Sequence, residues 1–184
     1  MKYKIGIIGL GYVGLPLAVE FGKKFSTIGF DVNSNRVNDL KKGHDITGEV
    51  SKRNVSSSLK LKFSSKVDDL SVCNIYIIAV PTPIDKNNNP NLSILISASE
   101  IVGNQIKKGD IVIYESTVYP GCTEEECVPV LEKTSKLKYN KDFFCGYSPE
   151  RISPGDKKRT LTKIQKITSG SNEEIALKVD KLYN

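Results

Sequence analysis

The chain has 184 residues, enough for one globular domain with a well-formed core and marginal for two. Its formal net charge of +6 comes from lysines scattered along the sequence, so it does not indicate nucleic-acid binding. No apolar run approaches the length of a membrane span, and no Arg-rich leader precedes the first predicted strand. We therefore expect a cytoplasmic protein that binds neither membranes nor nucleic acid.

The first predicted element lies in "KIGIIGLGYVGLPLA", from Lys4 to Ala18. Cations before an apolar run also begin a signal peptide, but here no small-residue cleavage site follows Ala18, and glycines interrupt the run. The short apolar run from Lys4 to Ile8, which is rich in β-branched isoleucine, instead predicts a buried parallel strand, after which Pro16 suits the first turn of a helix.

A G-x-G-x-x-G fingerprint joins this strand to this helix. Gly9 permits a tight turn, Gly11 lets a diphosphate approach the backbone, and Gly14 lets the helix pack closely on the strand. We expect Tyr12 and Val13, which lie between these glycines, to contact the cofactor as well. The N-terminus of the helix then faces the anion, so the segment predicts a dinucleotide site.

The next strand, in "STIGFD", ends at Asp31, about twenty residues beyond the first glycine, as a ribose contact requires. Asp31 would accept hydrogen bonds from the ribose hydroxyls of NAD and repel the extra phosphate of NADP. Arg36, one helical turn further on, has three possible roles: it packs beside the adenosine, accommodates a 2′-phosphate, or is a solvated helix residue. We favour the first.

Predicted strands alternate with helical segments along the whole chain, which indicates a Rossmann-like α/β fold: a doubly wound, mostly parallel sheet with helices on both faces. "SILISASEIVGNQIKK" has helical apolar spacing, and "TEEECVPVLEK" begins with a possible capping box formed by Thr123 and Glu126, before Pro129 kinks the helix. The predicted strands lie in "KIGIIG", "TIGFD", "CNIYIIAV", "DIVIYES", "DFFCGYS" and "KITSG".

The cysteines and the single histidine limit the possible chemistry. Cys73, Cys122, Cys127 and Cys145 form no C-x-x-C pair and are expected to be reduced thiols. His44 stands alone in a polar segment, which argues against a His-centred triad or a multi-histidine metal site, and we expect no metal. Cys122 lies near a predicted helix start, which could lower its pKa, but no base is nearby, so we expect it to be inert.

Ligands of open parallel sheets bind outside the carboxyl ends of the strands, and three candidate segments lie there: "AVPTP", "ESTVYPG" and "YSPERISPGD". The prolines of the first fix the backbone beside the cofactor, and the hydroxyls of the second lie near the expected nicotinamide. The carboxylate and guanidinium of the third could act as acid/base and anion clamp, or form an ordinary surface pair. The candidate residues are Val80, Pro81, Thr82, Ser116, Thr117, Glu150 and Arg151.

The last segment, "SNEEIALKVDKLYN", predicts a helix that begins with a capping box of Ser171 and Glu174. Ile175, Val179 and Leu182 share one face of it. A helix with an apolar stripe at this position suggests the front part of a longer protein, although a terminal docked helix is the alternative.

Four motifs, "GLGYVGLPLA", "VPTPID", "ESTVYPGCTEEECVPVLE" and "GYSPERISPGD", in this order resemble the UDP-glucose/GDP-mannose dehydrogenase superfamily. The match is nearest to the UDP-N-acetylgalactosamine and UDP-N-acetylglucosamine 6-dehydrogenases of surface-polysaccharide synthesis. The resemblance implies that a UDP-sugar C6 alcohol becomes a carboxylate while two NAD molecules each accept a hydride. Residues 1–170 would form the NAD-binding domain, and residues 171–184 would lead to a central helix and substrate domain absent from this chain. A homodimer or larger oligomer is implied for the full-length protein.

The resemblance also implies residue roles. Thr117 would position a water or the substrate, Glu150 would act in proton transfer or thioester hydrolysis, and Arg151 would contact the substrate. The cysteine that holds the covalent intermediate in relatives has no match here, so this chain alone is expected to be inactive. UDP-glucose relatives usually carry a second glutamate where Pro154 stands, which favours the N-acetylhexosamine branch.

Two other functions stay open on the sequence alone. One is a different dehydrogenase with a similar front domain, such as a 3-hydroxyacid type, although "ESTVYPG" and "SPER" argue against it. The other is a regulatory module that binds NAD without turnover. A nucleophilic cysteine motif beyond Asn184 would indicate an enzyme.

Overall fold

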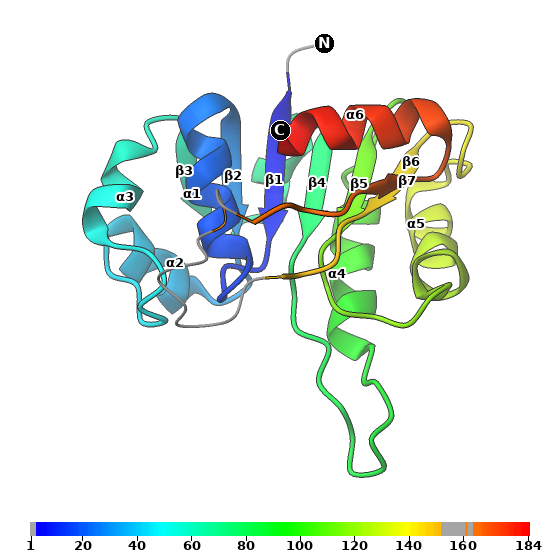
Figure 1. The fold of residues 1–184 in the computed structure, drawn as a ribbon, viewed down its shortest axis with the longest axis horizontal. Coiled ribbons are helices and arrows are strands. Elements are labelled where there is room, and N and C mark those ends of the chain that lie inside the picture. Colours follow the sequence, from blue (N-terminus) through cyan, green and yellow to red (C-terminus); the bar gives the residue numbers. More distant parts are fainter. Residues whose placement is uncertain (1–2, 152–160, 162–163) are drawn as a thin grey trace.

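The computed structural model describes residues 3–151, 161 and 164–184, in which a seven-stranded sheet runs in the order β3-β2-β1-β4-β5-β6-β7 (Figure 1). Every neighbouring pair is parallel except β6 and β7, which confirms the predicted Rossmann-like architecture. The strands are β1 (Lys4–Ile8), β2 (Ser26–Phe30), β3 (Leu61–Ser64), β4 (Ile75–Ile78), β5 (Ile111–Tyr114), β6 (Phe144–Tyr147) and β7 (Ser169–Gly170).

Helical segments cover both faces of this sheet. In Figure 1, α1 and α6 cross the near face, and α4 lies behind the sheet. The segments are α1 (Gly14–Lys24), α2 (Ser34–Lys41), α3 (Lys52–Ser57), η1 (Val67–Val72), α4 (Ser93–Gly103), η2 (Thr123–Cys127), α5 (Val128–Ser135) and α6 (Glu173–Tyr183).

Alternate strand residues supply two separate cores. On β4, Ile75 and Ile77 pack into the core with α1 and α6, whereas Tyr76 and Ile78 pack into the core with α4 and α5. All four side chains are buried, as expected for a strand covered on both faces. Each such isoleucine stabilises the fold by about 1.5–3 kcal/mol. The continuous apolar runs in the sequence are therefore a consequence of this two-sided burial.

The sequence pattern missed β3. This strand lies at the edge of the sheet, and its Leu61 and Phe63 are only partly buried, while Ser64 is buried. An edge strand needs less apolar sequence than a central one, so "LKFS" gives a weak strand signal.

Two predicted helix caps were wrong. The residue before α6 whose side chain caps it is Asn172, whose Oδ1 accepts from the N–H of Ile175 at 3.0 Å. Ser171 instead continues the β6–β7 pairing, because its N–H donates to the carbonyl of Cys145 at 2.8 Å. Thr123 lies inside a helical turn that begins without a side-chain cap.

Pro129 interrupts its helix as expected, in a specific form. A π-helical turn, η2, precedes α5, and the proline occupies the first turn of α5. Because proline has no N–H, it cannot donate to the carbonyl four residues earlier, so the wider turn falls where that bond is missing.

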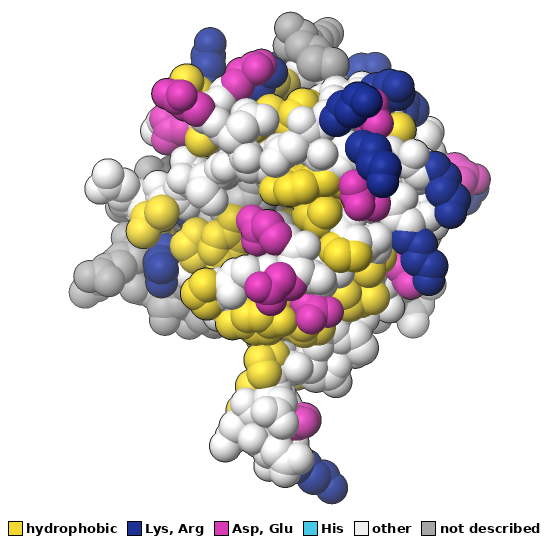
Figure 2. Space-filling view, turned by 90° about the vertical axis from the view of Figure 1, so that its right-hand side faces the viewer, with side chains coloured by type: hydrophobic (Ala, Val, Ile, Leu, Met, Phe, Trp, Pro, Cys, Tyr) yellow, Lys and Arg dark blue, Asp and Glu magenta, His cyan; other side chains and the backbone are white. Residues whose placement is uncertain are grey.

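The polar segment "IDKNNNPNL" forms a loop that projects from the body of the molecule (Figures 1 and 2). A backbone bridge between Ile84 and Pro90 closes its base. On the face drawn in Figure 2, basic side chains are interspersed with acidic ones. No helix within the described part of the chain is both long and apolar enough to cross a bilayer.

Candidate cofactor site

A cavity of about 570 Å³ lies at the point where the strand order reverses. From β1 the chain builds β2 and β3 on one side, then returns to build β4, β5 and β6 on the other. The loops after β1 and β4 therefore diverge from each other at the carboxyl ends of the strands, which is the usual ligand site of a doubly wound sheet.

Most of the sequence-predicted site residues line this cavity. They come from the glycine loop and from the ends of β2, β4, β5 and β6, which confirms that the topology brings these segments together. Three candidates, Gly14, Arg36 and Arg151, do not line it. The lining candidates are Gly9, Gly11, Tyr12, Val13, Asp31, Val80, Pro81, Thr82, Ser116, Thr117 and Glu150.

The sequence did not reveal that α4 forms a wall of the cavity. Ile94, Ser97 and Ile101 line it, while Leu95 and Val102 of the same helix are buried in the core. The spacing of apolar residues in "SILISASEI" predicts a helix, but these apolar residues face both the core and the cavity. Periodicity alone does not separate a core face from a ligand face.

The three glycines have distinct roles. Gly9 has a φ of 90°, a left-handed conformation that glycine adopts without strain. A Cβ on Gly14 would lie 1.8 Å from the carbonyl oxygen of Gly9, so α1 can begin this close to β1 only with glycine there. A Cβ on Gly11 would meet no atom within 4 Å, because the space in front of Gly11 is open. This opening beside a helix N-terminus fits the diphosphate of a dinucleotide.

Asp31 joins the end of β2 to the glycine loop. Its Oδ2 accepts from the N–H of Leu10 at 2.9 Å, and its Oδ1 accepts from the N–H of Asn33 at 2.9 Å. Each carboxylate oxygen has a second lone pair, so the partly exposed Asp31 can still accept from ribose hydroxyls.

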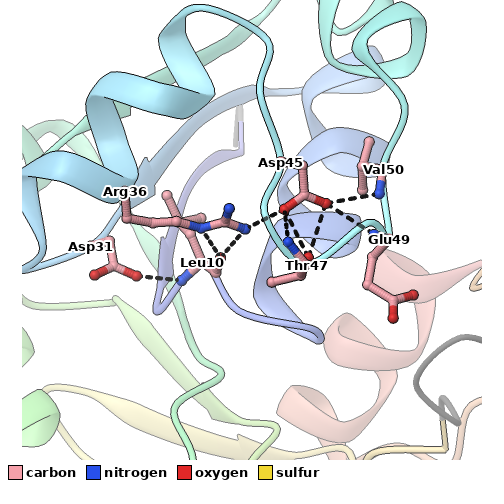
Figure 3. A network of polar contacts seen from close by, with 7 residues as sticks. All are labelled: Leu10, Asp31, Arg36, Asp45, Thr47, Glu49 and Val50. Atoms are coloured by element: carbon pink, nitrogen blue, oxygen red, sulfur yellow. Dashed lines mark hydrogen bonds and ion pairs between the residues drawn. The ribbon is translucent and has the colours of Figure 1, made fainter.

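Arg36 is not a solvated helix residue, and that alternative was wrong. Its side chain is 6% exposed and donates from Nε and Nη2 to the carbonyl of Leu10, at 2.9 and 2.8 Å. Nη2 also pairs with Oδ1 of Asp45 at 2.7 Å (Figure 3). Arg36 therefore contacts the outer side of the glycine loop rather than the cavity.

Hydroxyl groups fasten the loops at the opposite end of the cavity. Ser116 Oγ donates to the carbonyl of Val80 at 2.6 Å, and Thr82 Oγ1 donates to the carbonyl of Thr117 at 2.6 Å. The loops after β4 and β5 are thus bound to each other. The exposed Thr117 and the partly buried Glu150 lie on the cavity side of this junction.

Sequence reasoning missed a buried charge cluster at this end. Glu115 accepts from Lys166 Nζ and from the hydroxyl of Tyr183, each at 2.5 Å, and the Glu115 and Lys166 side chains are 0% and 6% exposed. Lys166 also donates to the carbonyl of Pro149 at 3.2 Å. Burial raises the pKa of Glu115, although the Lys166 ammonium opposes this effect. These contacts fasten β5, the residue before Glu150 and α6 together.

Glu150 and Arg151 are related through the backbone, where the N–H of Arg151 donates to Glu150 Oε1 at 2.5 Å. Arg151 is exposed and Glu150 lines the cavity. Pro154, the position at which the motif departs from UDP-glucose relatives, lies outside the described residues.

All four cysteines are buried free thiols, as the sequence predicted. Burial raises the pKa of Cys73 and of Cys127 to about 12, and it also raises the pKa of Cys122 despite the nearby helix start. A thiol that resists ionisation is a poor nucleophile, which agrees with the inert state expected for Cys122. Within the described residues, no group of three or more His, Cys, Asp or Glu side chains is arranged to hold a metal ion.

Comparison of the chain with known proteins agrees with a dinucleotide site in this cavity. Residues 3–184 match the model of the UDP-glucose/GDP-mannose dehydrogenase family, NAD binding domain. The chain is 57% identical over 180 residues to UDP-N-acetyl-D-glucosamine 6-dehydrogenase of Pseudomonas aeruginosa, covering 98% of the chain and 43% of that protein. It is 52% identical over 184 residues to Protein CapL of Staphylococcus aureus, covering 100% of the chain and 43% of that protein.

A solved structure of a related dehydrogenase has the same fold over nearly the whole chain. UDP-D-ManNAc dehydrogenase from Pyrococcus horikoshii superposes with a TM-score of 0.88 at 36% identity, covering 98% of this chain and 44% of that one. The chain therefore spans less than half the length of each of these three relatives.

Proposed function

Because the chain belongs to the UDP-glucose/GDP-mannose dehydrogenase family, as its NAD binding domain, we propose that it is the cofactor-binding part of a nucleotide-sugar 6-dehydrogenase. The reaction is oxidation of the C6 alcohol of a UDP-N-acetylhexosamine to a carboxylate in two NAD-dependent steps, for surface-polysaccharide synthesis. The observation that carries the proposal is the 57% identity to a UDP-N-acetyl-D-glucosamine 6-dehydrogenase, which extends over the segments that line the cavity.

That identity favours the gluco sugar, with UDP-N-acetylgalactosamine as the alternative substrate. The chain covers 43% of this relative, so we propose that residues 1–170 form the NAD-binding domain and that residues 171–184 lead toward the substrate-binding part. We expect the full-length protein to be a homodimer or larger. The use of NAD and a nucleotide sugar supports a cytoplasmic location.

The residues at the two ends of the cavity would have different roles. NAD, when bound, would be the hydride acceptor. The open backbone at Gly11 leaves room for the diphosphate, and Asp31 accepts from the ribose hydroxyls. At the other end, Thr117 orients a water or a substrate oxygen, and Glu150 holds or moves a proton at its carboxylate. Arg151, exposed beside it, is available to the anionic substrate.

The buried thiols of this chain do not supply the nucleophile. The raised pKa of Cys73, Cys122 and Cys127 opposes thiolate formation, so we place the cysteine that holds the aldehyde-level intermediate beyond residue 184. The chain alone should bind NAD without oxidising a sugar.

The test is NADH formation by the full-length protein with UDP-N-acetylglucosamine and, separately, with UDP-N-acetylgalactosamine. We expect two NADH for each sugar oxidised, with the gluco substrate preferred. NAD binding without NADH formation from either sugar would contradict the proposed reaction and support a regulatory module instead.

A further inference from the structure

A second buried charged pair lies on the outer side of the glycine loop, outside the cavity lining (Figure 3). It consists of Arg36 on α2 and Asp45 in the loop between α2 and α3, whose side chains are 6% and 1% exposed. Asp45 is not a candidate on sequence grounds, because it lies in the polar segment "KKGHD" that resembles an ordinary surface loop. Its near-complete burial in such a segment calls for a physical explanation.

The pair acts on the backbone of Leu10. The N–H of Leu10 donates to Asp31, and its carbonyl accepts from two nitrogens of Arg36, so both polar groups of this residue are held by side chains of opposite charge. The peptide between Leu10 and Gly11 is planar and trans, so the Gly11 N–H points in the direction opposite to the Leu10 carbonyl. Fixing that carbonyl against Arg36 therefore fixes the direction of the Gly11 N–H, away from the buried guanidinium.

Asp45 determines where the guanidinium lies. Its Oδ1 contacts Arg36 Nη2 at 2.7 Å, and its two oxygens accept from the backbone N–H groups of Thr47, Glu49 and Val50, each at 3.0 Å. Val50 is itself buried in the core with α1, so the loop that carries Asp45 is anchored to the body of the domain. Arg36 is thus held between a fixed carboxylate and the Leu10 carbonyl.

Electrostatics indicate what would follow from loss of Asp45. A buried guanidinium needs a carboxylate partner, and Asp45 supplies it for Arg36 (Figure 3). Without Asp45, the guanidinium would no longer be held in this position and would release the Leu10 carbonyl. The N–H groups of the glycine loop would then lose their fixed orientation.

We propose that Asp45 is a positioning residue for the cofactor diphosphate: by holding Arg36 against the carbonyl of Leu10, it aims the Leu10–Gly11 peptide of the glycine loop. The proposal rests on NAD binding by this domain and does not depend on the identity of the sugar. It places a determinant of cofactor affinity in the loop at 43–50, which does not line the cavity.

The experiment measures the affinity of this chain for NAD, ADP and adenosine, by calorimetry for the first two and by NMR titration for adenosine. In Asp45→Asn, affinity for NAD and for ADP should fall about tenfold, roughly 1.4 kcal/mol. Affinity for adenosine, which has no phosphate, should not change. The matched control is Asp85→Asn, because Asp85 also accepts from backbone N–H groups of its own loop, at Asn87 and Asn89, but lies in the projecting loop.

Two further variants separate positioning from loop folding. Arg36→Lys keeps the charge but loses the planar fork on the Leu10 carbonyl, so it should weaken NAD and ADP binding as Asp45→Asn does, even if Asp45→Asn fails to fold. Thr47→Ala removes a hydroxyl contact of Asp45 but leaves the Arg36 pair, so NAD affinity should stay within about twofold of the wild type.

Three results would overturn the proposal. The first is wild-type NAD affinity in both Asp45→Asn and Arg36→Lys. The second is an equal loss of adenosine affinity, which would assign the pair to the nucleoside. The third is the same loss in Thr47→Ala, which would show that folding of the loop decides the effect. A chain that binds no NAD at all, with wild-type sequence, would instead contradict the proposed function.

Discussion

Charged side chains have different roles at the two ends of the cavity. At the glycine loop, Asp31 and Arg36 hold the backbone of Leu10, next to the open space in front of Gly11. At the β5 and β6 end, Glu115 and Lys166 hold each other and Tyr183, so the charges fasten structural elements. The first arrangement prepares a binding surface, and the second supports a surface from which Thr117 and Glu150 reach the cavity.

This difference shows which functions this chain contains. The glycine-loop end has the groups that a dinucleotide needs: an open backbone at Gly11, a helix N-terminus and the carboxylate of Asp31. The other end presents a hydroxyl and a carboxylate, and none of the four buried thiols lines the cavity. Mutations at the first end should therefore change cofactor affinity, and mutations at the second should change stability or turnover.

The largest expected effect breaks the binding end. Gly11→Val places a branched side chain in the space in front of the loop and should weaken NAD binding by at least about 1000-fold, roughly 4 kcal/mol. The fold should persist, because a Cβ at this position meets no atom within 4 Å. NAD titration with circular dichroism checks this, with Gly11→Ala expected to lie between wild type and valine. Unchanged NAD affinity in the valine variant would show that the loop does not hold the diphosphate.

The next largest effect is expected at the β5 and β6 end of the cavity, where Glu115 pairs with Lys166. Lys166→Met leaves Glu115 buried without its cation and should lower the free energy of unfolding by about 3 kcal/mol. Urea unfolding measures it. The control is Lys178→Met, which breaks the exposed pair with Glu174 and should cost less than about 0.5 kcal/mol. Equal losses in the two variants would contradict the role given to the buried pair.

The same variant has a predictable pH dependence. Burial raises the pKa of Glu115, so the folded state binds a proton more readily than the unfolded state does. The stability of Lys166→Met relative to wild type should therefore rise as the pH is lowered, because the uncompensated carboxylate takes up a proton in the folded state first. A deficit that does not change with pH would mean that lost packing, rather than charge, causes it.

A smaller effect concerns turnover. In the full-length protein, Glu150→Gln should lower kcat about 100-fold, the low end for loss of a general acid or base, while NAD affinity stays the same. The measurement is steady-state NADH formation, with calorimetric NAD binding as the control. Wild-type turnover would show that Glu150 has no part in proton transfer and lies at the cavity only as a neighbour of Arg151.

The fold could be predicted from sequence where strands are covered on both faces, as in the apolar runs around Ile77 and Ile113. It could also be predicted at the glycine loop, where a side chain would block the close approach of backbone or ligand. The prediction from sequence was less accurate where two neighbouring residues could both cap a helix. Ser171 is of a type that often caps helices, but its backbone pairs with Cys145, and Asn172 caps α6 instead. At the site, the residues that follow the strands could be predicted to line the cavity, because the topology of a doubly wound sheet places the carboxyl ends of its strands there.

What the sequence could not show were partners distant in the chain. The contacts of Glu115 with Lys166 and Tyr183 span 51 and 68 residues. The contact of Arg36 with the Leu10 carbonyl spans 26. No local pattern relates such positions, so the roles of buried charged residues appear only once the fold brings them together.

The central claim is that this chain has a preformed site for NAD in which Asp31 selects against a 2′-phosphate. Calorimetric titration of the chain with NAD and with NADP tests it most directly. We expect NAD to bind at one site and NADP to bind at least about tenfold more weakly, roughly 1.4 kcal/mol, because the phosphate would meet the Asp31 carboxylate. Equal affinity for the two cofactors would contradict this account and would show that Asp31 does not select against the 2′-phosphate.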